Sequence, residues 1–220
     1  MGQVRCDEAA QAEPLDEEET PMLGPVLRAG DIALFPTDVG DLPLFRAWHA
    51  DLDVVRYLPN RFAPSSEQEE DWYRRVAASE REVLWSVRLG EQTIGYADMG
   101  IYWTSRTATT GTLLGDRSAW GKGYGSEVVR LRAAYAFGWL GLNRLEADSL
   151  AGNVAMHRAL EKAGYARIGT RHEYVYGDGK WHDSYLFELL RRDWESKQSA
   201  KSPGPGGPPC GEETGYSARY

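Results

Sequence analysis

The segment from Leu113 to Glu127 contains the residue types in this chain that are best suited to holding a phosphate group. It passes from an apolar run into closely spaced glycines and then into a stretch with helical periodicity. Glycine lets the backbone approach a ligand and adopt positive φ, so that successive N–H groups can point into one concavity. The N-terminus of the following helix adds free donors and partial positive charge. The segment therefore predicts a site for a phosphate or a pyrophosphate.

Two common phosphate-binding motifs do not fit this segment. A P-loop has four residues between its first glycine and its Gly-Lys pair, whereas five residues separate Gly115 from Gly121 here. The dinucleotide-binding motif needs a third glycine three places after the second, and Ser126 stands at that offset from Gly123. From spacing alone, the loop could also be only a tight connection between a strand and a helix.

Composition and charge exclude several classes of protein. The chain has 220 residues, 42% of them hydrophobic, which suits one domain with tails. Mean hydropathy is −0.52, and no apolar run approaches the roughly 20 residues of a membrane-spanning helix. Residues 1–20 are acidic, unlike the basic start of a secretory signal, so we expect a cytoplasmic protein with no membrane partner. The net charge of −8 comes mostly from this segment, and the balanced remainder argues against a nucleic-acid partner.

Cysteine and histidine usage points away from disulfides and metals. Cys6 and Cys210 lie one in each terminal segment, which does not indicate a disulfide framework. The histidines are scattered and have no cysteine partner at the spacing of a zinc site. They are His49, His157, His172 and His182. We therefore expect no bound metal.

The chain divides into one domain and two tails. Residues 1–24 form an acidic tail and residues 196–220 a tail rich in glycine and proline, and both compositions predict disorder. Residues 25–195 carry the periodic patterns of a folded domain. The patterns predict strands at 31–35, 83–89, 93–101, 107–114, 144–150, 166–176 and 181–190, and helices at 39–49, 66–78, from the glycine turn to about 139, and 153–163.

Hairpins early in the chain and strand–helix–strand units later predict an α/β sheet with antiparallel edges and a central parallel pair. Ser66 and Glu69 match a capping box at the start of the second helix. Its charged residues are expected on a solvated face, namely Glu67, Glu69, Glu70, Asp71, Arg74 and Arg75. Five tryptophans are expected to pack in the core or against helices: Trp48, Trp72, Trp85, Trp139 and Trp194.

The sequence Trp-Gly-Lys-Gly-Tyr-Gly-Ser-Glu at 120–127 resembles the acetyl-CoA pyrophosphate loop of the GNAT N-acetyltransferases. It is most similar to the RimJ/RimL-type branch, whose members often read W-G-K-G-Y-(A/G)-(T/S)-E. Further matches to that branch lie at 136–137, 140–146, 179–183 and 191–194, and in Asn153 with Glu161-Lys162 and Gly164-Tyr165. The resemblance covers most of residues 25–195 and is strongest from Thr107 onward.

The resemblance implies a single GNAT-type domain, whose mixed, mostly antiparallel sheet is flanked by helices. The sheet is splayed at a central parallel pair, 107–114 and 144–150, where the pantetheine arm of acetyl-CoA would insert. The implied cofactor-binding residues are Leu113, Leu114, Gly115, Trp120, Gly121, Lys122, Gly123, Tyr124, Gly125, Ser126 and Asn153. Asn153 is also a favoured helix N-cap, and both roles can hold together.

The implied reaction is attack of a neutral amine on a thioester, for which a general base removes a proton. Glu146 is the first candidate for this base, Asp148 the second and Asp98 the third. Glu146 could instead be a solvated acid or a partner of Arg144. Many members have a tyrosine that protonates the leaving thiolate, but the matching position here is Leu160.

Other features bear on the missing acid and on the acceptor. Met156 stands where many relatives have serine, and Tyr165, Tyr174 or a water could replace the missing acid. The thiolate could also leave unassisted, because the pKa of a thiol is only about 8.5. The expected acceptor is a protein N-terminus or a small-molecule amine, and the protein is expected to be a monomer or homodimer. The alternative function is an acyl-CoA-binding regulatory module without catalysis.

Overall fold

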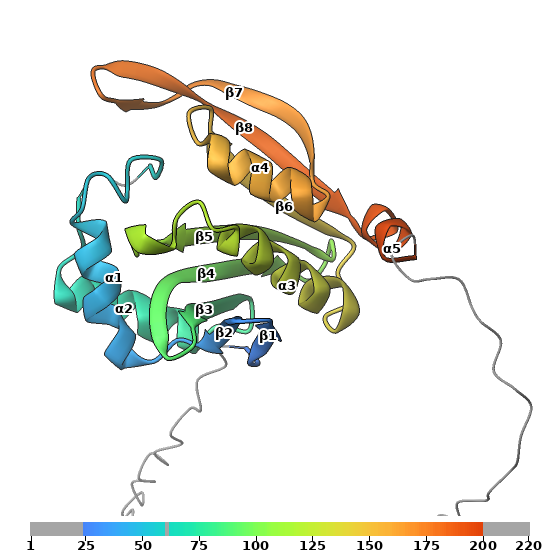
Figure 1. Cartoon of the computed structure of the whole chain (residues 1–220), viewed down its shortest axis with the longest axis horizontal. Helices are drawn as coiled ribbons and strands as arrows, with labels where there is room; N and C mark the ends of the chain where they lie inside the picture. The colour runs from blue at the N-terminus through green and yellow to red at the C-terminus, as the bar shows by residue number, and fades with distance from the viewer. Residues whose placement is uncertain (1–23, 60–61, 200–220) are drawn as a thin grey trace, which may run out of the picture.

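The structure is a computed structural model that describes residues 24–59 and 62–199 (Figure 1). Its strands are β1 (Leu27–Ala29), β2 (Ile32–Pro36), β3 (Glu82–Leu89), β4 (Gln92–Tyr102), β5 (Thr107–Leu114), β6 (Arg144–Leu150), β7 (Ala166–Gly177) and β8 (Lys180–Leu190). Its helices are α1 (Leu42–His49), α2 (Ser66–Ala77), α3 (Tyr124–Gly138), α4 (Val154–Ala163) and α5 (Arg191–Ser199), with short 3₁₀ turns at Val39–Asp41 and Arg117–Ala119.

All eight strands form one mixed sheet in the order β1-β2-β3-β4-β5-β6-β8-β7. Every neighbouring pair is antiparallel except β5 and β6, which are parallel. The predicted fold class, an α/β domain with one central parallel pair, is confirmed.

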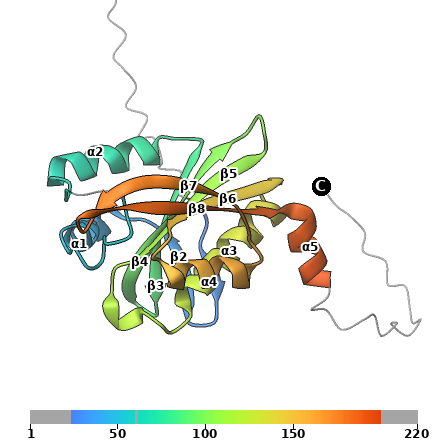
Figure 2. The same cartoon turned by 90° about the horizontal axis from the view of Figure 1, so that it is seen from above.

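Helices cover both faces of the sheet (Figure 2). On one face, α2 places Val76 against Leu84 of β3, and α1 packs against Leu113 of β5. On the other face, α3 and α4 bury apolar side chains against the central strands. This second layer contains the largest core, which includes Trp85, Val128, Val129, Phe137, Leu145, Leu160 and Phe187.

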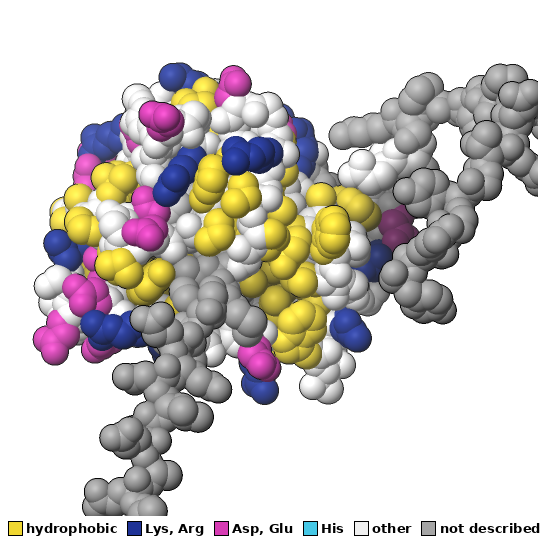
Figure 3. All heavy atoms as spheres, turned by 90° about the horizontal axis from the view of Figure 1, so that it is seen from below, with side chains coloured by type: hydrophobic (Ala, Val, Ile, Leu, Met, Phe, Trp, Pro, Cys, Tyr) yellow, Lys and Arg dark blue, Asp and Glu magenta, His cyan; other side chains and the backbone are white. Residues whose placement is uncertain are grey.

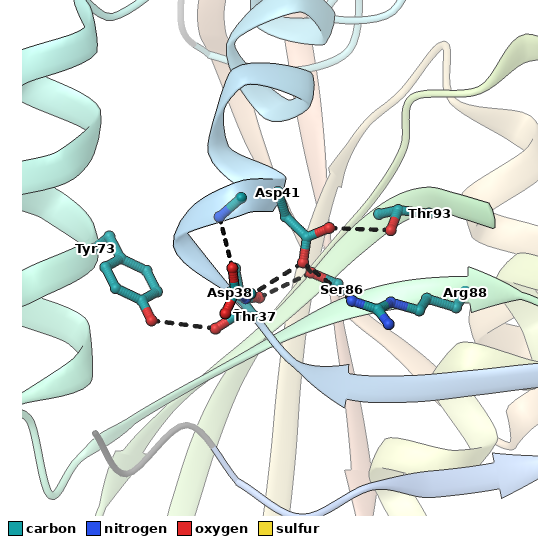
Figure 4. A network of polar contacts seen from close by, with 8 residues as sticks. Thr37, Asp38, Asp41, Tyr73, Ser86, Arg88 and Thr93 are labelled. Atoms are coloured by element: carbon teal, nitrogen blue, oxygen red, sulfur yellow. Dashed lines mark hydrogen bonds and ion pairs between the residues drawn. The ribbon is translucent and has the colours of Figure 1, made fainter. Parts of the chain in front are cut away.

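A polar network fixes α1 and α2 to the sheet (Figure 4). The Asp41 carboxylate accepts hydrogen bonds from Ser86 Oγ at 2.6 Å and from Thr93 Oγ1 at 3.1 Å. The Tyr73 hydroxyl of α2 donates to the main-chain oxygen of Thr37 at 3.3 Å. Asp41 thus joins the start of α1 to β3 and β4, and Tyr73 joins α2 to the residue after β2. These bonds fix the position of both helices over this face of the sheet.

The predicted capping box of α2 is wrong by one residue. Ser65 is the N-cap, and its hydroxyl accepts from the Gln68 amide at 3.2 Å, while the Gln68 side chain accepts from the Ser65 amide at 2.9 Å. The sequence Ser65-Ser66 allows either register, and the structure uses the earlier serine.

Two burial predictions are wrong. Trp139 is 85% exposed, because α3 ends just before it and its ring extends beyond the core. Glu69 is only 3% exposed, because α2 turns this position toward the sheet and toward Arg46 of α1. Trp48 and Trp85 are buried as predicted.

The predicted domain limits differ slightly from the structure. The short strand β1 and the helix α5 were not predicted, and α5 continues to Ser199, beyond the predicted domain limit at residue 195. Residues 1–23 and 200–220, which hold most of both predicted tails and both cysteines, lie outside the described residues.

The surface carries side chains of mixed character. On the face drawn in Figure 3, hydrophobic side chains lie between basic and acidic ones. Within residues 24–59 and 62–199, no helix has the length and apolar character to cross a membrane.

Candidate functional site

The parallel strands β5 and β6 stay paired over only three positions. Their ladder runs from Thr107 opposite Arg144 to Thr109 opposite Glu146. The Thr110 hydroxyl then donates to the Glu146 main-chain oxygen at 3.0 Å. Beyond this bond, residues 110–114 of β5 keep their pairing with β4 but have no strand partner on the β6 side. The strands therefore separate where the resemblance placed the splay.

A cavity of about 580 Å³ lies at this separation. Its walls come from the end of β5, the glycine loop, the start of α3, one side of α4, and the segment after α1. Nine predicted cofactor-binding residues line it: Leu113, Leu114, Trp120, Gly121, Gly123, Tyr124, Gly125, Ser126 and Asn153. The fold thus brings predicted cofactor-binding residues that lie far apart in the sequence to one site.

The glycine loop presents free backbone donors toward this cavity. Gly121 and Gly123 have φ values of 72° and 89°, a conformation that favours glycine. A Cβ built on either glycine would meet no atom within 4 Å, so the space in front of each is open. In the described part of the chain, the N–H groups of residues 121–125 have no acceptor, whereas the Ser126 amide already donates to Gly123 O at 2.9 Å. An anionic group fits the first five of these donors.

Two predicted cofactor-binding residues do not line the cavity. A Cβ on Gly115 would overlap the indole ring of Trp48, and the Gly115 amide donates to Ile94 O at 3.0 Å. Glycine at this position therefore serves packing against α1. Lys122 is exposed and lies outside the cavity wall. Trp120 does line it, and its indole N–H donates to Leu114 O at 2.8 Å, which holds the loop against the end of β5.

Asn153 performs the capping role. Its side-chain oxygen accepts from the Met156 amide at 3.2 Å at the start of α4. It also lines the cavity, so a ligand contact remains open to it. Leu160, on the same helix, is 1% exposed and packs in the core.

Several cavity residues were not predicted from the sequence. Arg158 and Lys162 lie one turn apart on α4 and bring positive charge to the cavity wall. Arg56 and Tyr57 come from the segment after α1, which Arg117 holds through ion pairs with Asp51 at 2.6 Å and with a neighbouring aspartate. For these residues the sequence offered one signal, the i, i+4 spacing of Arg158 and Lys162, which places both side chains on one face of α4.

The first two candidate bases are already paired with cations. Glu146 accepts a hydrogen bond from the Arg144 guanidinium, which also lies 3.8 Å from Glu188. Asp148 accepts from Ser184 Oγ at 3.2 Å and lies 3.5 Å from the Arg171 guanidinium. The pairing of Glu146 with Arg144 agrees with the structural alternative that the sequence left open.

Arg132 is a buried cation beside the strand separation, and it was not singled out from the sequence. It is 1% exposed and lies on α3. Its guanidinium donates to Asp98 O at 3.1 Å, to Thr112 Oγ1 at 3.1 Å, and to Gly111 O. It therefore joins β4 and β5 from the α3 side. The Tyr165 hydroxyl lies near this guanidinium, and burial raises the pKa of Tyr165.

Neither tyrosine proposed as a substitute acid lines the cavity. Tyr165 is 4% exposed within the core, and Tyr174 lies on the edge strand β7 near Arg171. Within the described ranges, no group of three or more histidine, cysteine, aspartate or glutamate side chains is arranged to hold a metal ion.

Comparisons with known proteins agree with this geometry. A family model described as "Acetyltransferase (GNAT) domain" matches residues 32–166. "Probable N-acetyltransferase YjcK" of Bacillus subtilis (strain 168) is 39% identical over 90 residues, which are 41% of this chain and 49% of that protein. "Uncharacterized N-acetyltransferase p20" of Bacillus licheniformis is 35% identical over 78 residues, or 36% of this chain and 44% of that protein. The chain thus spans about half the length of the curated relatives it matches.

A solved structure shares the fold. The spermidine N-acetyltransferase of Vibrio cholerae, in complex with CoA and spermine, superimposes with a TM-score of 0.71 at 18% identity. The superposition covers 75% of this chain and 98% of that one.

Proposed function

The chain belongs to the GNAT acetyltransferase family, and we propose that it transfers an acetyl group from acetyl-CoA to a primary amine by direct attack in a ternary complex. The observation that carries this proposal is the separation of β5 from β6 beside a loop of free N–H donors. The spermidine N-acetyltransferase, which has a related fold, was solved in complex with CoA.

The residues of the cavity fit the parts of acetyl-CoA. The amides of residues 121–125, with the N-terminus of α3, would hold the pyrophosphate, because free N–H groups and the helix dipole favour anions. Arg158 and Lys162 would add attraction to the phosphates. The free edge of β5 at 110–114 would hydrogen-bond the pantetheine arm, as a neighbouring strand would.

Acetyl-CoA, when bound, supplies the activated thioester. The protein has to hold the amine beside it and accept a proton, because an ammonium ion has no lone pair for attack. Deprotonation at pH 7 costs about 1.4 kcal/mol for an α-amine and about 4.6 kcal/mol for a lysine-like amine. Positioning the two reactants would supply much of the rate. Glu146 and Asp148 remain candidate bases, since their side chains lie on the face of the sheet that carries α2.

The resemblance of residues 120–127 to the RimJ/RimL-type branch supports a protein N-terminus as the acceptor, and a small-molecule amine is the equal alternative. The test is to incubate the protein with acetyl-CoA and a panel of primary amines and short peptides, and to measure free thiol. We expect amine-dependent release of CoA. Calorimetric binding of acetyl-CoA without any amine-dependent release would instead support the non-catalytic acyl-CoA-binding module.

A further inference from the structure

A second cavity, of about 400 Å³, lies between α2 and the sheet. Its wall includes Trp72 and Val76 of α2, Glu82 of β3, Asp98 and Tyr102 of β4, and Thr109 of β5. Thr109 is the last β5 residue that pairs with β6. The cavity therefore ends where the two strands begin to separate, on the face of the sheet opposite α3.

The Asp98 carboxyl group lies directly over the unpaired part of β5. Asp98 is in register with Gly111, two residues beyond the end of the β5–β6 ladder. A Cβ added to Gly111 would overlap Asp98 Oδ1, so this carboxyl group occupies the space above the Gly111 backbone. A ligand that extends along the free edge of β5 from Leu114 toward Thr110 passes beside this carboxyl group.

Asp98 differs from the other two acids in its partners. Glu146 and Asp148 each face a guanidinium within 4 Å on their own side of the sheet. In the described part of the chain, Asp98 forms no ion pair of that length, and the cation that acts on it is Arg132, on the α3 side. A cationic ligand in the cavity would supply the missing partner.

The charges around Asp98 suit proton acceptance. Burial is the largest effect and raises the pKa of the Asp98 carboxyl group, and Glu82 of β3 raises it further. Arg132 of α3 and a hydrogen bond from the Gly111 backbone lower this pKa and only partly offset the increase. Glu82 is itself held by Arg75 at 2.9 Å, and Arg81 lines the same cavity. A carboxylate whose pKa is raised is a stronger base than an ordinary aspartate.

The size and wall of the cavity limit the acceptor. About 400 Å³ is the lower part of the range for small-molecule sites, and the aromatic rings of Trp72 and Tyr102 line it. Asp98 and Glu82 are the two carboxyl groups of the wall, and Arg75 holds Glu82, which leaves Asp98 for a ligand. Such a wall suits a small amine with an apolar body, because the rings contact the body and the Asp98 carboxylate contacts the ammonium.

We propose that this cavity binds the acceptor, a small primary amine with an aromatic or apolar body, and that Asp98 contacts the amine and accepts its proton. This inference rests on the proposed acetyl transfer. The ammonium proton moves to the Asp98 carboxylate, and the freed lone pair forms the N–C bond as the C–S bond breaks with its electron pair on sulfur. The second nitrogen proton neutralises the thiolate, and Asp98 returns its proton to water.

The first test measures binding without turnover. CoA-loaded protein is titrated calorimetrically with 2-phenylethylamine, and wild type is compared with Asp98→Asn, Tyr102→Ala and Glu67→Gln. We expect Asp98→Asn to weaken amine binding at least tenfold with CoA affinity within twofold of wild type. Tyr102 is 57% exposed, so Tyr102→Ala should fold normally and weaken amine binding several-fold. Glu67→Gln, which removes an equal charge from the outer side of α2, should change neither affinity.

The second test measures turnover with acetyl-CoA. We expect Asp98→Asn to lower kcat/KM for 2-phenylethylamine at least 100-fold and by more than Glu146→Gln does. Amine affinity and rate near wild type in Asp98→Asn would overturn the inference while leaving acetyl transfer intact. Amine binding that is lost in Asp98→Asn, with no thiol release from wild type on any amine, would overturn the proposed function and leave the binding cavity standing. A higher kcat/KM for spermidine than for 2-phenylethylamine would overturn the substrate class.

Discussion

Substitution of Gly123 by alanine tests whether the glycine loop holds a pyrophosphate. The residue has a φ of 89°, and a Cβ there would point into open space where the ligand is expected. Displacing one charge-assisted hydrogen bond costs about 1.5–3 kcal/mol, equivalent to about a 10–150-fold rise in the Kd for acetyl-CoA. Left-handed backbone strain costs a further 1–2 kcal/mol, roughly, in folding stability, or about 2–8 °C in Tm for a domain of this size.

Gly90→Ala is the matched control. Gly90 has a φ of 60° in the β3–β4 turn, and a Cβ there would also meet nothing within 4 Å. It should therefore lose comparable stability and keep full affinity for acetyl-CoA. Titration calorimetry gives the affinities and differential scanning calorimetry gives Tm.

S-acetylpantetheine, which lacks the pyrophosphate, provides a second control for Gly123→Ala. The variant should bind it, or turn it over, as wild type does, because the substitution affects only the pyrophosphate contact. Equal losses of acetyl-CoA affinity in Gly123→Ala and Gly90→Ala would refute the assignment of the loop.

Two further substitutions test the packing around the site. Burial raises the pKa of Glu69, Arg46 only partly opposes this, and in the described residues Glu69 Oε2 has no hydrogen-bond partner. Because the pKa of Glu69 is raised in the folded state, the protein loses stability as pH rises past the ordinary pKa of glutamate. Glu69→Gln should therefore raise Tm by a few degrees at pH 7, and this gain should vanish near pH 4. Calorimetry at both pH values measures the two Tm differences. A lower Tm at pH 7 would show that the Arg46 ion pair outweighs the burial cost. Leu160→Tyr, which restores the tyrosine of many relatives, should cost about 1–3 kcal/mol in urea unfolding without raising kcat, because the side chain at this position is 1% exposed in the core. Higher turnover in this variant would show that a hydroxyl at this position reaches the leaving group.

Much of the fold could be predicted because its signals are local. The strands at 107–114 and 144–150 and the helix ending at Gly164 follow from periodicity and a C-terminal glycine, and the structure places them at those positions. The capping box shifted by one residue because two adjacent serines offer the same chemistry. The three-residue strand β1 was missed because its pairing with β2, rather than its own residues, defines it.

The sequence indicated the site through one glycine-rich segment and through the family resemblance, which added Asn153. The loop at 120–126 was found from its glycines, but Arg56 and Tyr57 reach the same cavity through the path of the chain after α1. Glu69 lies on the same helical stripe as Trp72, Tyr73 and Val76, and it was misplaced because its charge was taken to require solvent. Trp139 was misplaced because it follows the last residue of α3, where the helical period no longer applies. The relation of Asp98 to Gly111 depends on the β4–β5 register, which the sequence does not specify.

The short β5–β6 ladder also bears on how long the protein survives in a cell. Only three paired positions of β5 and β6 join the two halves of the sheet. A ligand bound between these strands would therefore stabilise the folded sheet, and its release would remove that stabilisation. A ligand whose free concentration is 100 times its Kd stabilises the folded state by about 2.7 kcal/mol. Proteolysis often follows the fraction of opened chain, so the amount of this protein would rise and fall with the supply of acetyl-CoA, the proposed ligand. A shortage of this proposed donor would then lower the abundance of the protein as well as the rate of the proposed transfer.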